Sequence, residues 1–575
     1  MSQQESTNAN PSGNTFSESK HEISRLERDC YYFGVSGRRP GPKLVYRTST
    51  DVFRNRVVVG QFTYICEMQL LPVYGHDKLS KLWNTILEET VKLLDKREIK
   101  FTSIDLARFR WSEEDRVPTT NTVTSRITIW IGVLPGSTTT EAAFHSSQGI
   151  LELLKQHEID DLDVAFRESV VRSLVMSDQR LEAIFYQNLR CSSELFAPEY
   201  EPHHDQNVID WATTSLSLPI AGRKTLHIQG SLGFYFRVGS DLYGVTARHV
   251  LFPQEEGNMP YKHVAPAPER EVVLMSERAY EDFLTSIRNR ERDLAVTVEY
   301  EQRRATTQRA QAETGDERAA IALESIEAEI ERKNKAIEAL DAFRAKIRDF
   351  RWSWDVDMRV IGHVVWAPPI SGNNPPYGYT QDLCVIKLDK SKFAANFRGN
   401  VIDLCHGRNL ERTIDFWWRI HPRHGAPSNF ELPLDYLYKL QRVLTPAQLK
   451  QPNTQDSNGD PVRFVFQKGH TSGLTIGPLN GFESHVRRYS LLGSFDSIEA
   501  AVYAYDTKSG PFSQCGDSGA VIAGDEQEFG LQLTSGAGSG NIELTDITYC
   551  TPMFWLWNHV IKPEFPGAEL YFDAI

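Results

Sequence analysis

The sequence contains no long hydrophobic run. Its longest apolar segments, such as ITIWIGVL at residues 127–134, are strand-sized, whereas a membrane-spanning helix needs about 20 apolar residues. The first 29 residues are polar and lack the apolar core of a signal peptide, so we predict that 1–29 is a disordered tail. These absences predict a protein with no membrane partner.

Cysteine is scarce and follows no pattern. The seven cysteines are odd in number and scattered, and none of them has CxxC spacing. This distribution fits neither a disulfide framework nor a zinc site, both of which need paired cysteines at regular spacings. The sequence therefore predicts reduced thiols and a location in the cytosol or the nucleus.

An excess of positive charge is also missing. The chain has 63 Lys and Arg against 76 Asp and Glu, which gives a net charge of -13. Nucleic acid is therefore not expected as a partner, because phosphate binding needs a basic surface. The content of 40% hydrophobic and 24% charged residues is that of a globular protein, and 575 residues are too many for one core. We expect several domains.

The first domain is predicted at residues 30–195, where strand-like and helix-like patterns alternate. FTYICEMQLLPV and SRITIWIGVLP are rich in β-formers, whereas KLSKLWNTILEETVKLLDKR carries apolar residues at helical spacing. The order β-α-β-β-α-β predicts an α+β ferredoxin-like domain with a scaffold or docking role, and a ligand-binding module is the alternative. Residues 196–214, which follow, are predicted to be a linker.

Residues 276–350 have a different character, with apolar residues three or four positions apart and charges between them. The segment AETGDERAA supplies a glycine stop and Asp316 as the N-cap of a second helix. We predict an antiparallel coiled-coil hairpin whose arms extend roughly 45 Å. Its apolar stripes either seal each other or serve a protein partner or a second copy of the chain. They consist of Tyr280, Leu284, Ile287, Leu294 and Val298, and of Leu323, Ile326, Ile330, Ile337, Leu340 and Ile347.

The segment CGDSGA at residues 515–520 has the composition of a nucleophile turn. A serine nucleophile needs an exposed Oγ and nearby N–H groups that stabilise an oxyanion. Gly516 and Gly519 allow the backbone conformations that such a turn requires. Ser518 is therefore a candidate nucleophile, although the motif alone also fits a serine in an ordinary turn.

Two further segments supply candidate partners for this serine. TARHV, which follows a strand-like segment, resembles the Thr-Ala-Ala-His element of chymotrypsin-like (trypsin-like) serine proteases and contains His249. In YTQDLCVIKLD, Asp382 precedes an apolar strand, as in the same family, and Asp389 is the weaker candidate. The order His249, Asp382, Ser518 is that of the chymotrypsin-like enzymes.

The resemblance covers residues 215–562 outside the hairpin. GHTSGLTIG at 469–477, FGLQLTSGAG at 529–538 and ITYCTPMFWLW at 547–557 resemble later strands and the terminal helix of the family. It implies an all-β double barrel, of the divergent intracellular type seen in fungal proteins with a long N-terminal extension. The predicted hairpin is then an insertion in the first barrel, and 563–575 is a C-terminal tail.

The family's roles, transferred to matching residues, make Ser518 the nucleophile, His249 the base and Asp382 the residue that orients the imidazole. The N–H groups of Gly516 and Ser518 form the oxyanion hole, and no metal or organic cofactor is implied. The implied specificity pocket contains Phe512 at its base and has Thr534, Ser535 and Gly536 along its wall. An acid is absent from the base position, so cleavage after Lys or Arg is not expected.

The chain departs from the family at two places beside the nucleophile. Ala520 replaces a glycine, and Asp517, whose counterpart in extracellular members pairs with a freed N-terminus, needs a different partner. Two functions follow as alternatives. One is an intracellular serine endopeptidase that acts on protein or peptide substrates, and the other is an inactive protease-like scaffold that works through its N-terminal domain and hairpin.

Overall fold

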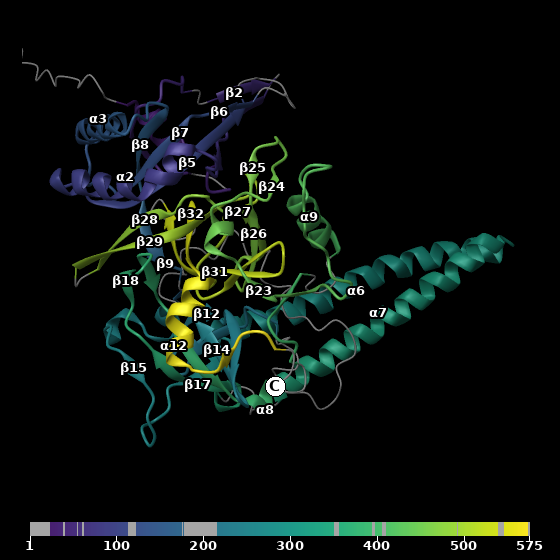
Figure 1. Cartoon of the computed structure of the whole chain (residues 1–575). Helices are drawn as coiled ribbons and strands as arrows, with labels where there is room; N and C mark the ends of the chain where they lie inside the picture. Colours follow the sequence, from purple (N-terminus) through teal and green to yellow (C-terminus); the bar gives the residue numbers. More distant parts are fainter. Residues whose placement is uncertain are drawn as a thin grey trace, which may run out of the picture.

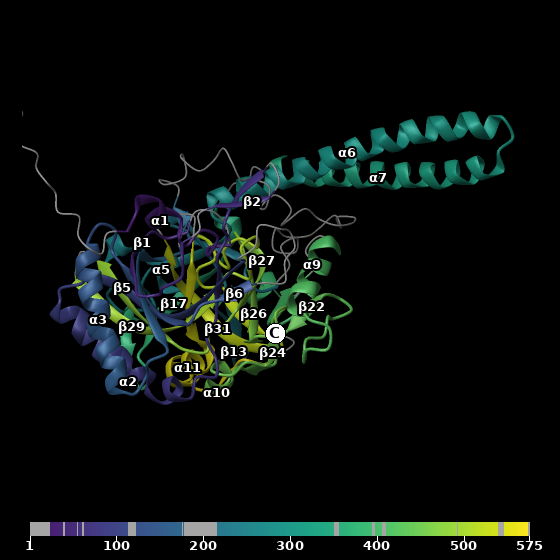
Figure 2. The ribbon, with the colours of Figure 1, turned by 90° about the horizontal axis from the view of Figure 1, so that it is seen from above.

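The protein is described from a computed structural model, which is drawn in Figure 1 and Figure 2. It describes residues 23–37, 41–53, 56–59, 62–112, 122–174, 176–177, 215–349, 356–393, 397–404, 410–490, 493–538 and 545–572. The predicted linker at 196–214 and most of the predicted tail at 1–29 lie outside these ranges. None of the described helices combines the length and the hydropathy that crossing a bilayer requires.

The N-terminal module consists of a β-sheet with two helices on one side of it (Figure 1). Helix α2 (Asp77–Lys96) buries Leu79, Trp83 and Ile86, and α3 (Thr140–Gln156) begins at Thr139, whose side chain caps it. The parallel pair β7–β8 is joined by α3, and all other pairs in this module are antiparallel. The strands are β1 (Leu44–Arg47), β4 (Gln69–Leu71), β5 (Phe101–Ser112), β7 (Ile127–Val133), β8 (Leu162–Glu168) and β9 (Val170–Ser173).

A second β-sheet, formed mainly by strands after residue 219, has only antiparallel pairs among the described strands. Neighbouring strands follow the order β12, β11, β16, β17, β20, β14, β13. The short β33 (Ala568–Glu569) pairs with β13, and Leu570 beyond it is buried, so residues 568–570 of the predicted C-terminal tail pack on this sheet. The strands are β11 (Pro219–Gly222), β12 (Thr225–Ser231), β13 (Phe234–Val238), β14 (Asp241–Thr246), β16 (Glu271–Leu274), β17 (Val360–Ala367) and β20 (Cys384–Leu388).

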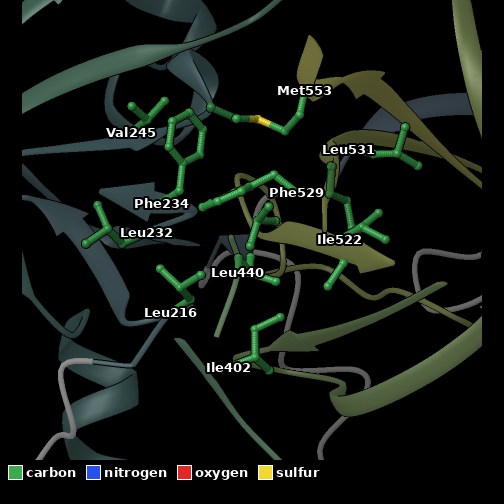
Figure 3. Packing of buried hydrophobic residues seen from close by; sticks show 14 of the residues in the cluster. Leu216, Leu232, Phe234, Val245, Ile402, Leu440, Ile522, Phe529, Leu531 and Met553 are labelled. Atoms are coloured by element: carbon green, nitrogen blue, oxygen red, sulfur yellow. The ribbon is translucent and has the colours of Figure 1, made fainter. Parts of the chain in front are cut away.

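A third group of strands, after residue 463, packs against the second sheet. Figure 3 shows Leu232, Phe234 and Val245 of the second sheet facing Phe529 and Met553 in this interface. The helical segment 553–564 (α11, η5 and α12) closes one end of it. The strands are β26 (Phe464–Gly469), β27 (Gly473–Pro478), β28 (Ser484–Ser490), β29 (Gly493–Tyr503), β30 (Val521–Gly524), β31 (Glu528–Gly538) and β32 (Ile547–Pro552).

The N-terminal module and this third group of strands form one continuous sheet. Strand β5 pairs antiparallel with β28, and β9 pairs antiparallel with β31. Tyr503 Oη also donates to the carbonyl of Leu106, at 2.8 Å, and both side chains are buried. The sequence placed a boundary between these two regions, whereas hydrogen bonds between strands connect them.

The predicted helical hairpin is present. Helix α6 (Glu277–Glu313) starts after Ser276, whose Oγ accepts from Ala279 N, and α7 (Glu317–Asp349) starts after Asp316, which accepts from Arg318 N. The two helices lie antiparallel and extend away from the β-sheets in both views (Figure 1, Figure 2). Beyond Ala279 and Tyr280 at the start of α6, buried positions along the pair include Val298, Ala305, Ala319, Ile326 and Leu340. The apolar stripes therefore cover each other, at least in part.

Short elements occupy the remaining connections. They are α1 (Arg25–Cys30), β2 (Arg56–Val59), β3 (Phe62–Ile65), β6 (Thr122–Thr124), β10 (Met176–Ser177), α5 (Arg248–Leu251), η2 (Gln254–Glu256), β15 (Tyr261–Lys262), η3 (Val356–Arg359), β18 (Ser371–Asn374), β19 (Tyr379–Gln381), α8 (Lys390–Phe393), β21 (Val401–Asp403), α9 (Leu410–Ile420), β22 (Leu437–Lys439), β23 (Arg442–Val443), α10 (Pro446–Leu449), β24 (Thr454–Gln455) and β25 (Pro461–Val462).

Candidate active site

Two adjacent strands bring His249 and Asp382 together. Strands β14 and β20 are antiparallel neighbours, with Thr246 opposite Cys384. His249 lies in the short helix α5, which follows β14, and Asp382 lies two residues before β20. Because these positions are at the same end of the strand pair, the side chains meet although 133 residues separate them.

The contact between the two residues is made by two hydrogen bonds. His249 Nδ1 lies 2.6 Å from Asp382 Oδ2, and the backbone N–H of His249 donates to Asp382 Oδ1 at 3.2 Å. Burial raises the pKa of Asp382, but the charge and the hydrogen bonds of His249 outweigh that effect and hold the pKa below its ordinary value. Asp382 is therefore an acceptor that fixes the ring of His249.

Ser518 lies on the other side of the same ring. Its Oγ is 2.7 Å from His249 Nε2, and the serine is fully buried. With Nδ1 donating to Asp382, Nε2 is the ring nitrogen that accepts the Ser518 hydroxyl proton. The turn is held by Ser231 N, which donates to the Ser518 carbonyl at 2.9 Å.

Gly519 is required by the shape of this turn. It has a φ of +90°, and a Cβ there would lie 2.4 Å from Thr246 Oγ1 and 2.6 Å from the Ser231 carbonyl. Ala520, by contrast, is fully buried, and its N–H donates to the Asp517 carbonyl at 3.0 Å. The extra methyl group at 520 is accommodated within the core behind the nucleophile.

The Asp517 carboxylate accepts hydrogen bonds from three backbone N–H groups in neighbouring turns. Its Oδ1 accepts from the N–H groups of Thr471 and Ser472 at 2.9 and 3.2 Å, and its Oδ2 accepts from Gln514 N at 2.8 Å. Burial raises the pKa of this carboxyl, and the backbone N–H donors oppose that shift. Backbone N–H groups of the turn between β26 and β27 are therefore partners of the Asp517 carboxylate.

The predicted oxyanion residue Gly516 donates to a backbone carbonyl from the N-terminal part of the chain. Its N–H lies 2.8 Å from the carbonyl oxygen of Leu174. Leu174 follows β9, which runs antiparallel along β31 with Ser173 opposite Ser535 and Arg172 opposite Gly536. Reasoning from the sequence missed Leu174, because VVRSL contains no motif.

The predicted pocket residues separate into two groups. Thr534, Ser535 and Gly536 are buried on β31, where a Cβ at Gly536 would lie 3.3 Å from Leu174 Cδ2. Gly536 therefore borders the Leu174 side chain. Phe512 is buried, its carbonyl accepts from Thr475 Oγ1 at 2.7 Å, and its ring lies under Gly477 of β27.

A buried charge beside β31 was also missed. Arg488 on β28 donates from Nη2 to Ser535 Oγ at 2.8 Å, and the same nitrogen lies 3.5 Å from Glu499 Oε1. Arg488 also lowers the pKa of Asp382 through its charge, after the larger contribution of His249. Its sequence context, in an ordinary strand pattern, gave no signal of this position.

The described residues contain one group with the spacing of metal ligands. Ligand atoms of His263, Glu269 and His363 lie within 4.8 Å of one another. His363 Nδ1 and Glu269 are 3.4 Å apart, so an ordinary ion pair accounts for their approach. Cys384 and Cys550, both buried, are free thiols.

Comparison with known proteins gave one kind of match. No family model matches the chain, and no curated protein matches it. A matching solved structure is a glutamic-acid-specific serine protease described as using a histidine triad in substrate binding. The match has a TM-score of 0.26 and 10% identity, and it covers 62% of this chain and 100% of that chain. A likeness this distant leaves the assignment of the site to the contacts described above.

Proposed function

We propose that the chain is a serine endopeptidase that hydrolyses peptide bonds through an acyl-enzyme. The observation that carries this proposal is the pair of hydrogen bonds linking Asp382 to His249 at 2.6 Å and His249 to Ser518 at 2.7 Å. A nucleophile, a base and an orienting acid in hydrogen-bond contact are the parts that activate a serine. The free thiols of Cys384 and Cys550 fit a cytosolic or nuclear enzyme.

Each residue then has one role in the reaction. Ser518 Oγ attacks the carbonyl carbon of the peptide bond while His249 Nε2 takes its proton. Asp382 keeps Nδ1 protonated and stabilises the imidazolium that forms. The N–H groups of Gly516 and Ser518 stabilise the oxyanion, and His249 then protonates the departing amine. Water releases the acyl group by the same route in reverse.

The strand arrangement supports a chymotrypsin-like fold for residues 215–562. In this fold the second sheet and the third group of strands are the two barrels, and the nucleophile lies between them. The hairpin at 276–350 is inserted between β16 and β17 of the first barrel. The module at 30–195 is read as the ferredoxin-like domain.

A fluorophosphonate probe tests the proposed activity, because it forms a covalent adduct with an activated serine. The Leu174 carbonyl accepts the hydrogen bond of the Gly516 N–H, so this donor is not open to the probe in the wild-type chain. The probe is therefore applied both to the wild-type chain and to Leu174→Glu. Leu174 is 5% exposed, and an ionised side chain there would be expelled from its site. Peptide mapping is expected to find the adduct on Ser518, with Leu174→Glu reacting faster.

Ser518→Ala and His249→Ala are the controls, and neither is expected to form the adduct. An unlabelled Ser518 in both wild type and Leu174→Glu, under conditions in which a reference protease reacts, would contradict the proposal. The alternative, an inactive protease-like scaffold, would then stand.

We also propose that the hairpin is an association arm for a second copy of the chain. Three large apolar side chains on it stay exposed, namely Val296, Tyr300 and Ile321, with exposed fractions of 61%, 59% and 70%. Exposed apolar side chains on a projecting element favour association. The measurement that checks this is part of the first prediction in the Discussion.

A further inference from the structure

The N-terminal part of the chain reaches into the candidate active site in the manner of a peptide substrate. Strand β9 adds to the edge of β31, which includes the predicted wall of the specificity pocket. Addition of an extended segment to a strand edge is a common way in which proteins bind peptides. At the end of β9, the Leu174 carbonyl oxygen lies 2.8 Å from Gly516 N, one of the two predicted oxyanion donors.

The chain is held on the far side of the nucleophile as well. Strand β10 pairs antiparallel with β12, with Met176 opposite Gln229 and Ser177 opposite Ile228. Two residues further along β12, Ser231 N donates to the Ser518 carbonyl. Strand β9, which precedes Leu174, is therefore paired with β31, and strand β10, which follows it, is paired with β12. These two partner strands belong to the two sheets that meet at Ser518.

The side chain of Leu174 lies where a substrate residue would enter a specificity pocket. It is 5% exposed and borders Gly536, as described above. It belongs to the same buried apolar cluster as Leu533 and Phe512. A site built in this way selects an apolar side chain of about the size of leucine.

We propose that the Leu174–Val175 peptide bond is a substrate of Ser518, so that the protein cleaves itself into residues 1–174 and 175–575. This inference rests on the proposed peptidase function and names a substrate for it. The reaction is intramolecular, because the Leu174 carbonyl lies at the candidate active site of its own chain. Holding the reacting groups together in this way replaces the encounter of two molecules.

The reaction consumes one water molecule. Ser518 Oγ bonds to the carbonyl carbon of Leu174, and its proton passes to His249. The C–N bond to Val175 breaks, and the nitrogen takes the proton from His249 to become a free amine. Water then attacks the ester carbon and gives one proton to His249. The ester C–O bond breaks, Ser518 Oγ takes that proton back from His249, and Leu174 leaves as a carboxylic acid that releases its remaining proton to solvent.

The two fragments stay together after cleavage. The module is held to the third group of strands by β5–β28 pairing, which lies outside the cleaved segment. Tyr549 Oη donates to Asp105 at 2.9 Å, and Trp83 Nε1 donates to the Glu483 carbonyl at 2.7 Å. Other substrates therefore enter the cleft only when β9 withdraws from β31.

Intact-mass spectrometry of the purified full chain tests the proposal. Wild-type protein is expected to yield fragments 1–174 and 175–575 that elute together from a sizing column, and N-terminal sequencing is expected to begin at Val175. Ser518→Ala is expected to remain one chain. The rate constant is expected to stay unchanged over a hundredfold dilution, since the reaction is intramolecular, and a rate proportional to concentration would overturn that part of the proposal.

Substitutions at Leu174 test the role of its side chain. Leu174→Glu is expected to slow cleavage at this bond by about a hundredfold or more, because an ionised carboxylate does not enter an apolar site. Leu174→Met, which conserves volume, is expected to cut at the same bond. Leu434→Glu is the matched control, since Leu434 is fully exposed in a turn, and this variant is expected to be cut at the wild-type rate.

The outcomes separate this inference from the proposed function. An uncut wild-type chain together with a labelled Ser518 in Leu174→Glu would overturn self-cleavage, identify β9 as an uncleaved inhibitory segment and leave the peptidase proposal intact. An uncut chain in which Ser518 stays unlabelled in every variant would contradict both the self-cleavage inference and the peptidase proposal. Cleavage at Leu174–Val175 that persists in Ser518→Ala would also overturn the inference.

Discussion

Two regions are added to the β-sheets that carry the candidate active site, and they are attached in opposite ways. The N-terminal module shares a continuous sheet with the third group of strands and exchanges buried hydrogen bonds with it. The hairpin α6–α7 packs on the second sheet near its root, through Tyr280, and then extends away (Figure 1). The module is thus part of the folded core, whereas the hairpin is a projecting arm.

Deleting each region in turn gives the largest expected contrast. Removal of residues 1–174 leaves the β28 and β31 edges open and exposes buried Tyr503 and Tyr549, so the chain is expected to aggregate. Replacing residues 277–349 by a short glycine-serine linker is expected to leave a folded protein whose Tm changes by less than about 5 °C. Solubility and thermal unfolding are the measurements.

Light scattering on the same deletions checks the association arm. The mass per particle is expected to fall to that of one chain when the hairpin is removed. The triple variant Val296→Ser, Tyr300→Ser, Ile321→Ser is expected to do the same without shortening the helices. A folded, soluble chain lacking residues 1–174 would contradict the claim that the module is part of the folded core. A particle mass that is unchanged after removal of the hairpin would contradict its role in association.

The sequence carried much of the information on where the chemistry-bearing residues lie. His249, Asp382 and Ser518 each had a local context that singled them out, because a nucleophile turn and a strand end restrict composition. The distances that join them depend on the pairing of β14 with β20 and on the packing of the two sheets. The hairpin was confirmed, because its apolar spacing and its caps are local signals.

The sequence could not show that β9 lies along β31. A peptide on a strand edge is held by backbone N–H and C=O groups, which nearly every residue has, so VVRSL carries no mark of its partner. The same reason hid the pairing of β5 with β28, since alternation predicts the buried face of a strand but not its neighbour. Both contacts join segments that are hundreds of residues apart.

A buried ion pair in the module and an exposed one on the hairpin give the second contrast. Arg167 Nη2 lies 3.1 Å from Asp105 Oδ2, both side chains are fully buried, and the guanidinium carbon is 3.3 Å from the ring centre of Trp130. Arg167→Met leaves the buried carboxylate of Asp105 without its cationic partner, and we expect a loss of about 3 kcal/mol in the free energy of unfolding. Arg309→Met breaks a pair with Glu327 in which both side chains are about half exposed, and the expected loss is below about 1 kcal/mol.

Urea unfolding measures both values. The double variant Asp105→Asn, Arg167→Met is the control, since it removes the stranded charge while keeping an oxygen that can accept from Tyr549. It is expected to be more stable than Arg167→Met alone. Equal losses for Arg167→Met and Arg309→Met would show that the module is attached no more firmly than the arm.

The smallest expected effect is a pH dependence at the contact between the N-terminal segment and β32. Ser36 Oγ donates to Asp546 Oδ1, and Asp546 Oδ2 has no hydrogen-bond partner among the described residues. Burial raises the pKa of Asp546 from 3.8 to about 6, with the charge of Arg167 and the Ser36 hydrogen bond opposing it. The folded state therefore holds a proton that the unfolded state has released between these two pH values.

Because the folded state binds the additional proton, its stabilising contribution is complete below pH 4 and is lost as the pH rises through 6. The loss is on the order of 2 kcal/mol from pH 4 to pH 7. Asp546→Asn keeps an acceptor for Ser36 and cannot ionise, so its stability is expected to fall less than that of wild type over this range. Glu324→Gln on the exposed surface of the hairpin is the matched control, and the pH curve of this variant is expected to follow that of wild type. If Asp546→Asn also follows wild type, Asp546 is ionised in the folded protein and the Ser36 contact is a bond to a charged group.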